Sequence, residues 1–406
     1  MPSAPDISGK RRVLITLYVI ATFFYWMSQY LYVPTLPLYI RSKTENLALV
    51  GVVLSMYGLW QTIIRIPLGI AADWVGWRKP FLLGGVALAG LGAWTMGAAP
   101  DVATILIGRA LTGLAAGTWV LFVVAFSRLF PSDDVVRATA LLTLAGSIGR
   151  TLATGATGAL NNAGGYSLAF FLAAGTAAAA VCLVLPIQEQ RQPPQRFSFE
   201  KFGRILKNRD VLFPSVLSAI SQHAIWSSSY GFIPILAKQL GATDVLQSVL
   251  LSMNIAVVAF GNMLTATLER HVGVRRIVYL SFVLMFAGMC AAALASSLLP
   301  LFVAQFCTGL AWGIGYPVLM GLSIRRVADP ERATAMGIHQ AIYGVGMFSG
   351  PWVGGILSNR VGIPVMLGVT ALACLAAGLL GTYWFTRKIE HSSPRCRKLK
   401  NLKKSS

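Results

Sequence analysis

The chain has 406 residues, of which 55% are hydrophobic and only 12% are charged, and its formal net charge is +20. Soluble domains carry about 25% charged residues, so this composition excludes an ordinary water-soluble protein. The apolar residues form long continuous runs, which exclude spanning β-strands because those alternate apolar and polar residues. The sequence therefore predicts an all-α membrane protein.

Twelve apolar runs, each long enough to cross a bilayer, follow one another along the chain. In chain order the predicted spans are 13–37, 48–71, 80–98, 102–127, 138–160, 166–187, 211–237, 245–268, 277–298, 301–324, 334–358 and 364–386. They predict two six-helix bundles, at residues 1–187 and 211–387. Residues 188–210 form a linker between the bundles, and residues 388–406 form a basic tail.

The basic residues gather on one side of the predicted membrane. Of the 34 Lys and Arg residues, 27 lie in the two terminal segments and in the loops that share their side. By the positive-inside rule, both termini are expected in the cytoplasm of a multi-pass inner (plasma) membrane protein. The charge is expected to face anionic lipid headgroups on that side rather than nucleic acid.

The linker carries apolar residues that would share one face of a helix, namely Phe199, Phe202, Ile205 and Leu206. Basic residues lie mostly on the other face. This pattern favours a short amphipathic helix on the membrane surface over a solvated linker.

The second six spans repeat the first. Residues 112–117 (TGLAAG) recur as residues 308–313 (TGLAWG), and residues 137–140 (RATA) recur as residues 332–335. The offsets between the paired segments are nearly equal. This indicates two pseudo-symmetric bundles related by an axis along the membrane normal, an arrangement that lets the halves rock about a central site.

The loop between the second and third spans, residues 69–79, reads GIAADWVGWRK. It resembles the signature loop of the major facilitator superfamily, Gly-x-x-x-Asp-Arg-x-Gly-Arg-Arg, with tryptophan at two positions where basic residues are usual. The resemblance extends over nearly the whole chain and implies the fold of that superfamily. It also implies a cytoplasmic latch that holds the halves together when the site faces outward, formed by Gly69, Asp73, Gly76, Arg78 and Lys79. Within it, Gly69 is expected to let two helices approach closely, and Gly76 to permit a tight reversal.

Three further segments resemble motifs of the drug:proton antiporters of this superfamily. Residues 109–117 are similar to the fourth-helix motif, whose arginine the family uses in proton coupling or in bonding to facing helices. Residues 34–37 match a Pro-x-Leu-Pro at the end of the first span. Residues 350–355 (GPWVGG) resemble the antiporter motif, but they lie in span eleven, whereas the family carries that motif in span five.

Ionisable residues inside the predicted membrane are costly, so each is a functional hypothesis. None of the 14 carboxylates falls mid-span. The spans instead contain Arg65, Arg109, Arg150 and His223. Arg150 is expected to face the centre, and Arg65 to extend towards the surface. Arg109 and His223 are candidates for proton coupling, with a hydrogen-bonded packing role as the alternative for His223.

Aromatic, amide and arginine residues lie at matching mid-span depths and form the predicted substrate site. They are Tyr25, Trp26, Gln29, Arg109, Trp119, Phe122, Arg150, Gln222, Trp226, Tyr230, Asn254, Trp312, Tyr316 and Tyr343.

These observations predict a secondary transporter that moves a small organic solute by alternating access. The first interpretation is proton-coupled efflux of amphiphilic, drug-like compounds. The alternatives are a carrier of an anionic or neutral metabolite that uses the buried arginines, and a non-transporting receptor. No nucleophile–base pair, metal cluster or cofactor motif stands out, so an enzyme, a metal site and a cofactor are not expected. The expected partners are the solute and the bilayer, and the chain is expected to act as a monomer.

Overall fold

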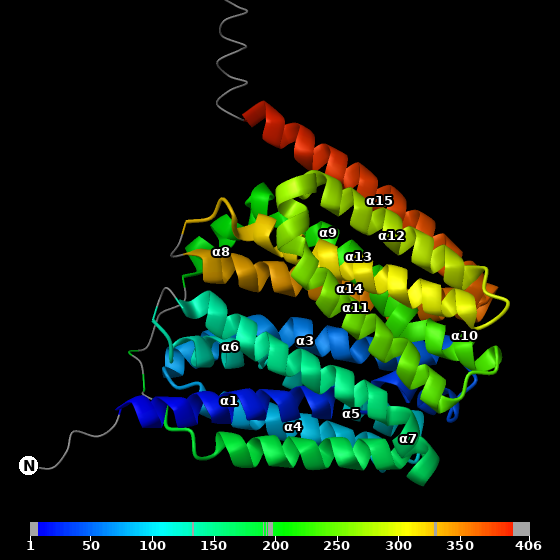
Figure 1. The fold of residues 1–406 in the computed structure, drawn as a ribbon, viewed down its shortest axis with the longest axis horizontal. Coiled ribbons are helices and arrows are strands. Elements are labelled where there is room, and N and C mark those ends of the chain that lie inside the picture. The colour runs from blue at the N-terminus through cyan, green and yellow to red at the C-terminus, as the bar shows by residue number, and fades with distance from the viewer. Residues whose placement is uncertain are drawn as a thin grey trace, which may run out of the picture.

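The computed structural model describes residues 7–131, 134–189, 191, 193, 198–328 and 331–392. Within these residues nearly the whole chain is helical and no strand occurs. The long helices run side by side, the first half of the chain forming one body and the second half another (Figure 1). The predicted all-α fold with two helical bundles is confirmed.

In the described residues, the first bundle contains eight helical segments. They are α1 (Ile7–Tyr30), η1 (Val33–Thr35), α2 (Leu36–Arg41), α3 (Leu47–Val75), α4 (Lys79–Gly97), α5 (Val102–Ala116), α6 (Trp119–Ser127) and α7 (Val135–Val184). The helix α7 contains the predicted spans five and six. Its backbone leaves the helical conformation at Gly164 and Gly165, where the chain turns back on itself (Figure 1). Gly165 has φ of 70°, a value that favours glycine.

The linker and the second bundle follow the same plan. Their segments are α8 (Phe199–Leu206), α9 (Arg209–Ser227), the π-helical η3 (Ser228–Phe232), α10 (Ile233–Gln239), α11 (Asp244–Val272), α12 (Val274–Ala293), α13 (Leu299–Ile324), α14 (Arg332–Val361) and α15 (Ile363–Ser392). In the described part of the chain, nine helices are long and apolar enough to span a membrane. Dividing α7 in two and adding α14 and the interrupted helix α9–α10 gives the twelve predicted spans.

In the described residues, the helices of spans one, four and seven are interrupted, that of span seven by the π-helical η3. Pro34 and Pro37 break span one into α1, η1 and α2, because proline lacks the N–H that continues a helix. Span four breaks between α5 and α6. There the Tyr25 hydroxyl donates to the Ala115 carbonyl (2.8 Å), and Gln61 Nε2 donates to the Ala116 carbonyl (3.4 Å). The Ala115 carbonyl also accepts from the Thr118 N–H (3.0 Å), so these carbonyls at the break are paired, as a membrane interior requires.

The repeat seen in the sequence also appears in the packing. A Cβ on Gly92 would lie 2.6 Å from the Gly108 carbonyl oxygen, and one on Gly288 would lie 2.9 Å from the Ala304 carbonyl oxygen. Gly113 and Gly309 meet neighbouring backbone in the same way, at 2.7 and 2.8 Å. Equivalent helices thus approach each other through equivalent small residues, which is how helices associate closely in lipid.

The two bundles meet through two helix pairs, α3 with α14 and α7 with α11. We call the face where α1 begins and α15 ends the termini face, and the other the opposite face (Figure 1). Near the opposite face, a Cβ on Gly51 would lie 2.8 Å from the Gly355 Cα. Nearby, the Leu47 N–H donates to Asn359 Oδ1 (3.1 Å), and the Gly158 N–H donates to Ser248 Oγ (2.7 Å). Near the opposite face the bundles therefore approach so closely that the backbone of one contacts the backbone of the other.

The linker helix α8 forms where the sequence predicts it, but Phe202 and Ile205 of its apolar face pack against protein, whereas Leu206 is exposed. Ile205 is 2% exposed and clusters with Val211, Val327, Ala335 and Ile338 of the second bundle. Arg204 pairs with Glu331 on the same side. These contacts dock α8 onto the second bundle. Contact of α8 with the membrane surface stays a prediction.

Candidate functional site

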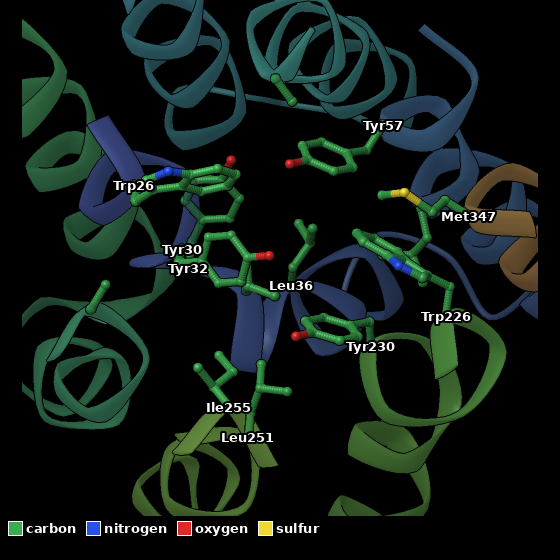
Figure 2. Packing of buried hydrophobic residues seen from close by; sticks show 14 of the residues in the cluster. Trp26, Tyr30, Tyr32, Leu36, Tyr57, Trp226, Tyr230, Leu251, Ile255 and Met347 are labelled. Carbon is green, nitrogen blue, oxygen red and sulfur yellow. The ribbon is translucent and has the colours of Figure 1, made fainter. Parts of the chain in front are cut away.

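A group of aromatic side chains lies where the two bundles meet, and we call it the central aromatic cluster (Figure 2). It consists of Trp26, Tyr30, Tyr57, Trp226 and Tyr230, all 7% exposed or less. Tyr57 of α3 stacks on Trp226 of α9 with ring centroids 5.4 Å apart, and Trp226 stacks on Tyr230 at 4.9 Å. The stack therefore joins one bundle to the other.

The guanidinium group of Arg109 lies over the Tyr57 ring, at the end of the stack that belongs to the first bundle. Its Cζ is 4.3 Å from the centroid of the Tyr57 ring, and the residue is 2% exposed. Its Nε and Nη1 atoms are buried and have no hydrogen-bond partner in the structure. Arg109 thus carries N–H donors that the protein leaves unused.

A second arginine contacts the other side of the cluster. Arg150 Cζ lies 4.8 Å from the Trp26 ring centroid and 5.7 Å from that of Tyr30. Its Nη2 donates to Ser147 Oγ (3.1 Å), whereas its buried Nε has no partner. Arg150 therefore turns towards span one and the bundle interior rather than towards hydrocarbon, as its sequence position predicted.

The two arginines have no carboxylate partner within the described residues. The ion pairs found there join Asp73 to Arg78, Glu331 to Arg204, Asp244 to Lys238 and Asp210 to Arg326. A buried charge costs several kcal/mol, and a desolvated cation–π contact returns about 2 kcal/mol. The aromatic faces therefore offset only part of the cost. The unused N–H groups are suited to water or to the acceptor atoms of a bound solute.

Several predicted site residues make packing contacts within one bundle. Tyr25 bonds the backbone of α5, and Gln29 Nε2 donates to the Thr112 carbonyl (3.3 Å). Phe122 is fully buried against Tyr25. Asn254 Nδ2 donates to the Gln305 carbonyl at 2.8 Å, which joins α11 to α13 inside one bundle. These contacts lie within one bundle and outside the central aromatic cluster, whereas Gln29 Oε1 and Asn254 Oδ1 are buried without a partner. Contact of these residues with a solute stays a prediction.

Other predicted residues adjoin the cluster. Trp119 contacts Trp26 edge to face at 5.2 Å, and Trp312 contacts Tyr230 at 6.2 Å. The Trp226 and Trp312 Nε1 atoms and Gln222 Oε1 are buried without partners. They add further polar atoms for a solute.

The sequence did not single out Tyr30 or Tyr57. Tyr57 occupies the position in the first bundle that Asn254 occupies in the second, because Gly113 packs against the Tyr57 carbonyl and Gly309 against the Asn254 carbonyl. The repeat therefore relates Tyr57 to a predicted site residue.

A second group of buried polar residues lies nearer the termini face. Arg65 Cζ is 5.4 Å from the Tyr343 ring centroid, and Arg65 Nη1 donates to the Gln340 carbonyl of the other bundle (3.1 Å). Tyr316 contacts Tyr343 at 5.8 Å. His339, which sequence reasoning missed, is fully buried beside both tyrosines. A titratable residue inside span eleven was the available signal.

The expectation that Arg65 extends to the surface was wrong, because only 5% of its area is exposed. It lies on the side of α3 that packs against α14, so it is buried between the bundles. His223 forms the kind of bond foreseen for a packing residue, with its Nδ1 2.9 Å from Ser349 Oγ of the same bundle.

The predicted latch loop is held by contacts within the first bundle and with Glu189 at the start of the linker. Asp73 pairs with Arg78, and the Arg78 and Lys79 N–H groups donate to Glu189 Oε2 (2.9 and 2.7 Å). Gly76 ends α3 with φ of 68°, which confirms the tight reversal. Nothing lies within 4 Å of a Cβ placed on Gly69, so the expected close helix approach there was wrong. The latch role itself stays a prediction.

The glycines of span eleven that resemble the antiporter motif lie at close helix contacts. Cβ atoms on Gly346 and Gly350 would lie 2.0 and 2.5 Å from carbonyl oxygens of α9, and one on Gly344 would lie 2.2 Å from Thr62 Oγ1 of α3. Gly350 begins the segment that resembles the antiporter motif, and the three glycines together let α14 pack tightly against α9 and α3.

A polar pocket of about 380 Å³ opens at the opposite face between the bundles. It is lined by Asn161, Asn162, Gly165, Tyr166, Lys238, Thr243 and Asp244. Asn161 Nδ2 donates to Asp244 Oδ2 and to Thr35 Oγ1, both at 2.9 Å, and Lys238 Nζ lies 3.5 Å from Asp244 Oδ1. The bond from Asn161 to Asp244 ties the first bundle to the second at the opposite face.

Replacing Asn161 by alanine is expected to weaken closure at the opposite face. The loss of a hydrogen bond to a charged group costs about 1.5–3 kcal/mol, which raises the open population about 10- to 150-fold. In a background without native cysteines, labelling of Ser248→Cys by a membrane-impermeant thiol reagent measures this opening. Asn162→Ala, at an exposed neighbour in the same pocket, is the control. Equal labelling of the two variants would contradict the role of Asn161.

Comparison with known proteins identifies the family to which this sequence is similar. A sequence model described as the Major Facilitator Superfamily matches residues 18–230 and 215–403. The chain is 38% identical over 69 residues to the inner membrane transport protein YajR of Escherichia coli (strain K12), which is 17% of this chain and 15% of that protein. It is 26% identical over 244 residues to a chloramphenicol efflux pump of Mycobacterium tuberculosis, which is 58% of this chain and 57% of the pump. The aligned region spans less than two thirds of each relative.

Solved structures share the fold over nearly the whole chain. The nucleoside transporter NupG has a TM-score of 0.71 at 18% identity, with 93% of this chain and 98% of that chain covered. A POT family transporter in complex with 5-aminolevulinic acid has a TM-score of 0.77 at 12% identity, covering 93% and 96%. The human organic anion transporter MFSD10 has a TM-score of 0.68 at 15% identity, covering 93% and 100%. At these identities the likeness shows the fold alone.

Proposed function

The chain belongs to the major facilitator superfamily, and from this premise we propose that it exports a neutral or anionic amphiphilic organic solute in exchange for protons. The family makes it a multi-pass membrane transporter of small solutes and not an enzyme. The solute class, the direction and the coupling ion are our proposal.

One observation carries the choice of solute class, namely two arginines at the central aromatic cluster, Arg109 buried and Arg150 half-buried, for which the described residues supply no carboxylate partner. Arg109 and Arg150 supply positive charge and unused N–H donors. The stacked rings of Tyr57, Trp226 and Tyr230 supply flat apolar faces. A solute with an aromatic part and an acceptor or anionic group would match both, whereas an organic cation would meet electrostatic repulsion.

The similarity to a chloramphenicol efflux pump supports export of drug-like compounds. It extends over only part of each chain, so the geometry of the site has the greater weight. An anionic or neutral metabolite carried by uniport or symport remains the second candidate, and the same two arginines favour it. A receptor that binds without transport is the third.

Alternating access is supported by where the bundles touch. They are in close contact near the opposite face through α3–α14 and α7–α11. The contacts found for the latch loop are with the first bundle and the start of the linker, not with the second bundle. This arrangement fits a carrier that is closed at the opposite face. With the termini in the cytoplasm of the plasma membrane, as the charge distribution favours, that closed face is the outside. We further propose that one chain suffices for transport.

A flux assay with purified protein in liposomes tests the proposal. Under an imposed pH gradient, we expect movement of chloramphenicol, as a neutral solute, and of an aromatic sulfonate, as an anion, but not of tetraphenylphosphonium, as a lipophilic cation. Protein-free liposomes and the Arg150→Gln variant are the controls. Movement of the cation alone would contradict the arginine argument. Specific binding without flux would favour the receptor.

A further inference from the structure

A carrier driven by protons needs a titratable group whose protonation depends on how the bundles are placed. The sequence has 14 carboxylates, and those in the described residues lie in loops and at helix ends. Two histidines lie deep in spans, His223 and His339. They differ in what they contact. His223 bonds Ser349 of its own bundle, whereas His339 adjoins a residue that the other bundle supplies.

The hydrogen bonds of His339 indicate which ring nitrogen carries the hydrogen when the ring is neutral. Ser215 Oγ donates to the Val211 carbonyl oxygen at 2.6 Å, so it accepts at 3.0 Å from His339 Nδ1. This places the ring hydrogen on Nδ1 and leaves Nε2 as the basic nitrogen. Ser218 Oγ lies 3.5 Å from Nε2 and can turn to accept if that nitrogen gains a proton. The pocket can therefore accommodate a neutral imidazole and can also pair both N–H groups of an imidazolium.

Arg65 brings a positive charge from the first bundle to the same place. Its guanidinium lies over the Tyr343 ring at 5.4 Å, and the His339 ring centroid is 6.2 Å from that of Tyr343. Arg65 also donates to the carbonyl of Gln340, the residue that follows His339. A proton on His339 would therefore place two like charges close together in a dry interior, where each disfavours the other.

The other groups around His339 do not cancel this repulsion. The residues that face it are Ser215 and Ser218 of α9, Tyr316 of α13, Tyr343 of its own helix and Arg65 of α3. Among the described residues no carboxylate forms an ion pair with His339 or Arg65. Arg65 is thus the charged group that controls this site.

From this geometry we propose that His339 carries the coupled proton and that Arg65 excludes that proton while the bundles are in contact. The proposal rests on the proposed proton-coupled transport. The step is a single proton transfer from water to Nε2 of the neutral imidazole, and its reversal after the bundles move. Rotation that withdraws Arg65 from Tyr343 removes the competing charge and admits water, so proton uptake and movement of the bundles occur together.

The experiment uses the full chain in liposomes loaded with a pH-sensitive dye. Chloramphenicol flux and proton flux are measured together across a pH series that brackets the ordinary histidine pKa of about 6.5. In His339→Gln we expect solute exchange to persist while solute-driven proton flux falls at least tenfold and the pH profile flattens. In Arg65→Gln we expect the midpoint of the profile to move up by about one pH unit. In Arg65→Lys, which keeps the charge, we expect a smaller shift. His223→Gln is the control that should keep the profile of the unaltered chain, and Asp244→Asn tests whether a carboxylate at the bundle contact carries the proton instead.

The outcomes separate this proposal from the proposed function. Solute flux without proton flux in the unaltered chain would refute the role of His339 and leave the transporter standing, whereas absence of any solute flux would refute the transporter. Loss of proton flux in His223→Gln or Asp244→Asn, but not in His339→Gln, would assign the proton elsewhere. If His339→Gln fails to fold, an unmoved midpoint in Arg65→Gln still refutes the exclusion.

Discussion

Replacement of Gly58 by leucine is expected to reduce transport to a small fraction of the original rate. A Cβ on Gly58 would lie 2.5 Å from the backbone of Met347 and Phe348 in α14. Backbone atoms cannot move aside as a side chain can, so α3 and α14 must separate. Overpacking costs about 1–3 kcal/mol, which corresponds to a shift of about 5–150-fold away from the closed contact. A carrier that cannot close at the opposite face cannot complete its cycle.

The measurement is the initial rate of solute uptake, combined with thiol labelling of Ser248→Cys from the opposite face. Gly84→Leu is the matched control, because Gly84 lies in a helix, is exposed and has nothing within 4 Å of a Cβ. Gly58→Ala extends the test to a milder change and should lie between the two. Normal transport by Gly58→Leu would show that this contact is not part of the cycle.

Replacement of Arg109 by glutamine is expected to lower transport of neutral and anionic solutes by about 10²-fold. The variant loses the charge over Tyr57 and N–H donors that have no partner in the protein. Removal of one hydrogen-bonded charge from a desolvated site costs about 2–5 kcal/mol. Glutamine remains polar and fits a similar volume, so the loss should fall on binding more than on folding.

Competition binding and uptake at several solute concentrations measure this effect. Arg109→Lys keeps the charge but loses the planar face that stacks on Tyr57, and we expect it to recover part of the affinity. Arg204→Gln, a change at an exposed arginine of α8, is the surface control. Unchanged affinity in Arg109→Gln, with normal thermal stability, would remove Arg109 from the site.

The sequence predicted most of the fold because its signals are long and repeated. Apolar runs fix the spans, and the offset between the halves appears again in the packing of Gly92 and Gly288. The proline breaks and the reversal at Gly76 follow from properties of single residues. Such local effects need no knowledge of neighbouring helices.

The site was predicted less well, because depth in the membrane does not tell which way a side chain points. Asn254 and Tyr25 lie at the right depth, but they bond backbone within their own bundles. Arg65 was expected at the surface, yet it lies between α3 and α14. The rotation of each helix about its axis depends on which small residues meet, and a single sequence does not show those pairs.

The stack of Tyr57 on Trp226 has a practical consequence. One ring belongs to each bundle, and indole emission depends on the immediate surroundings of the ring. Rocking of the halves should therefore change the emission of Trp226, so the unlabelled molecule would report its own motion by light. Subtracting the spectrum of Trp226→Phe isolates that signal from the other nine tryptophans of the chain.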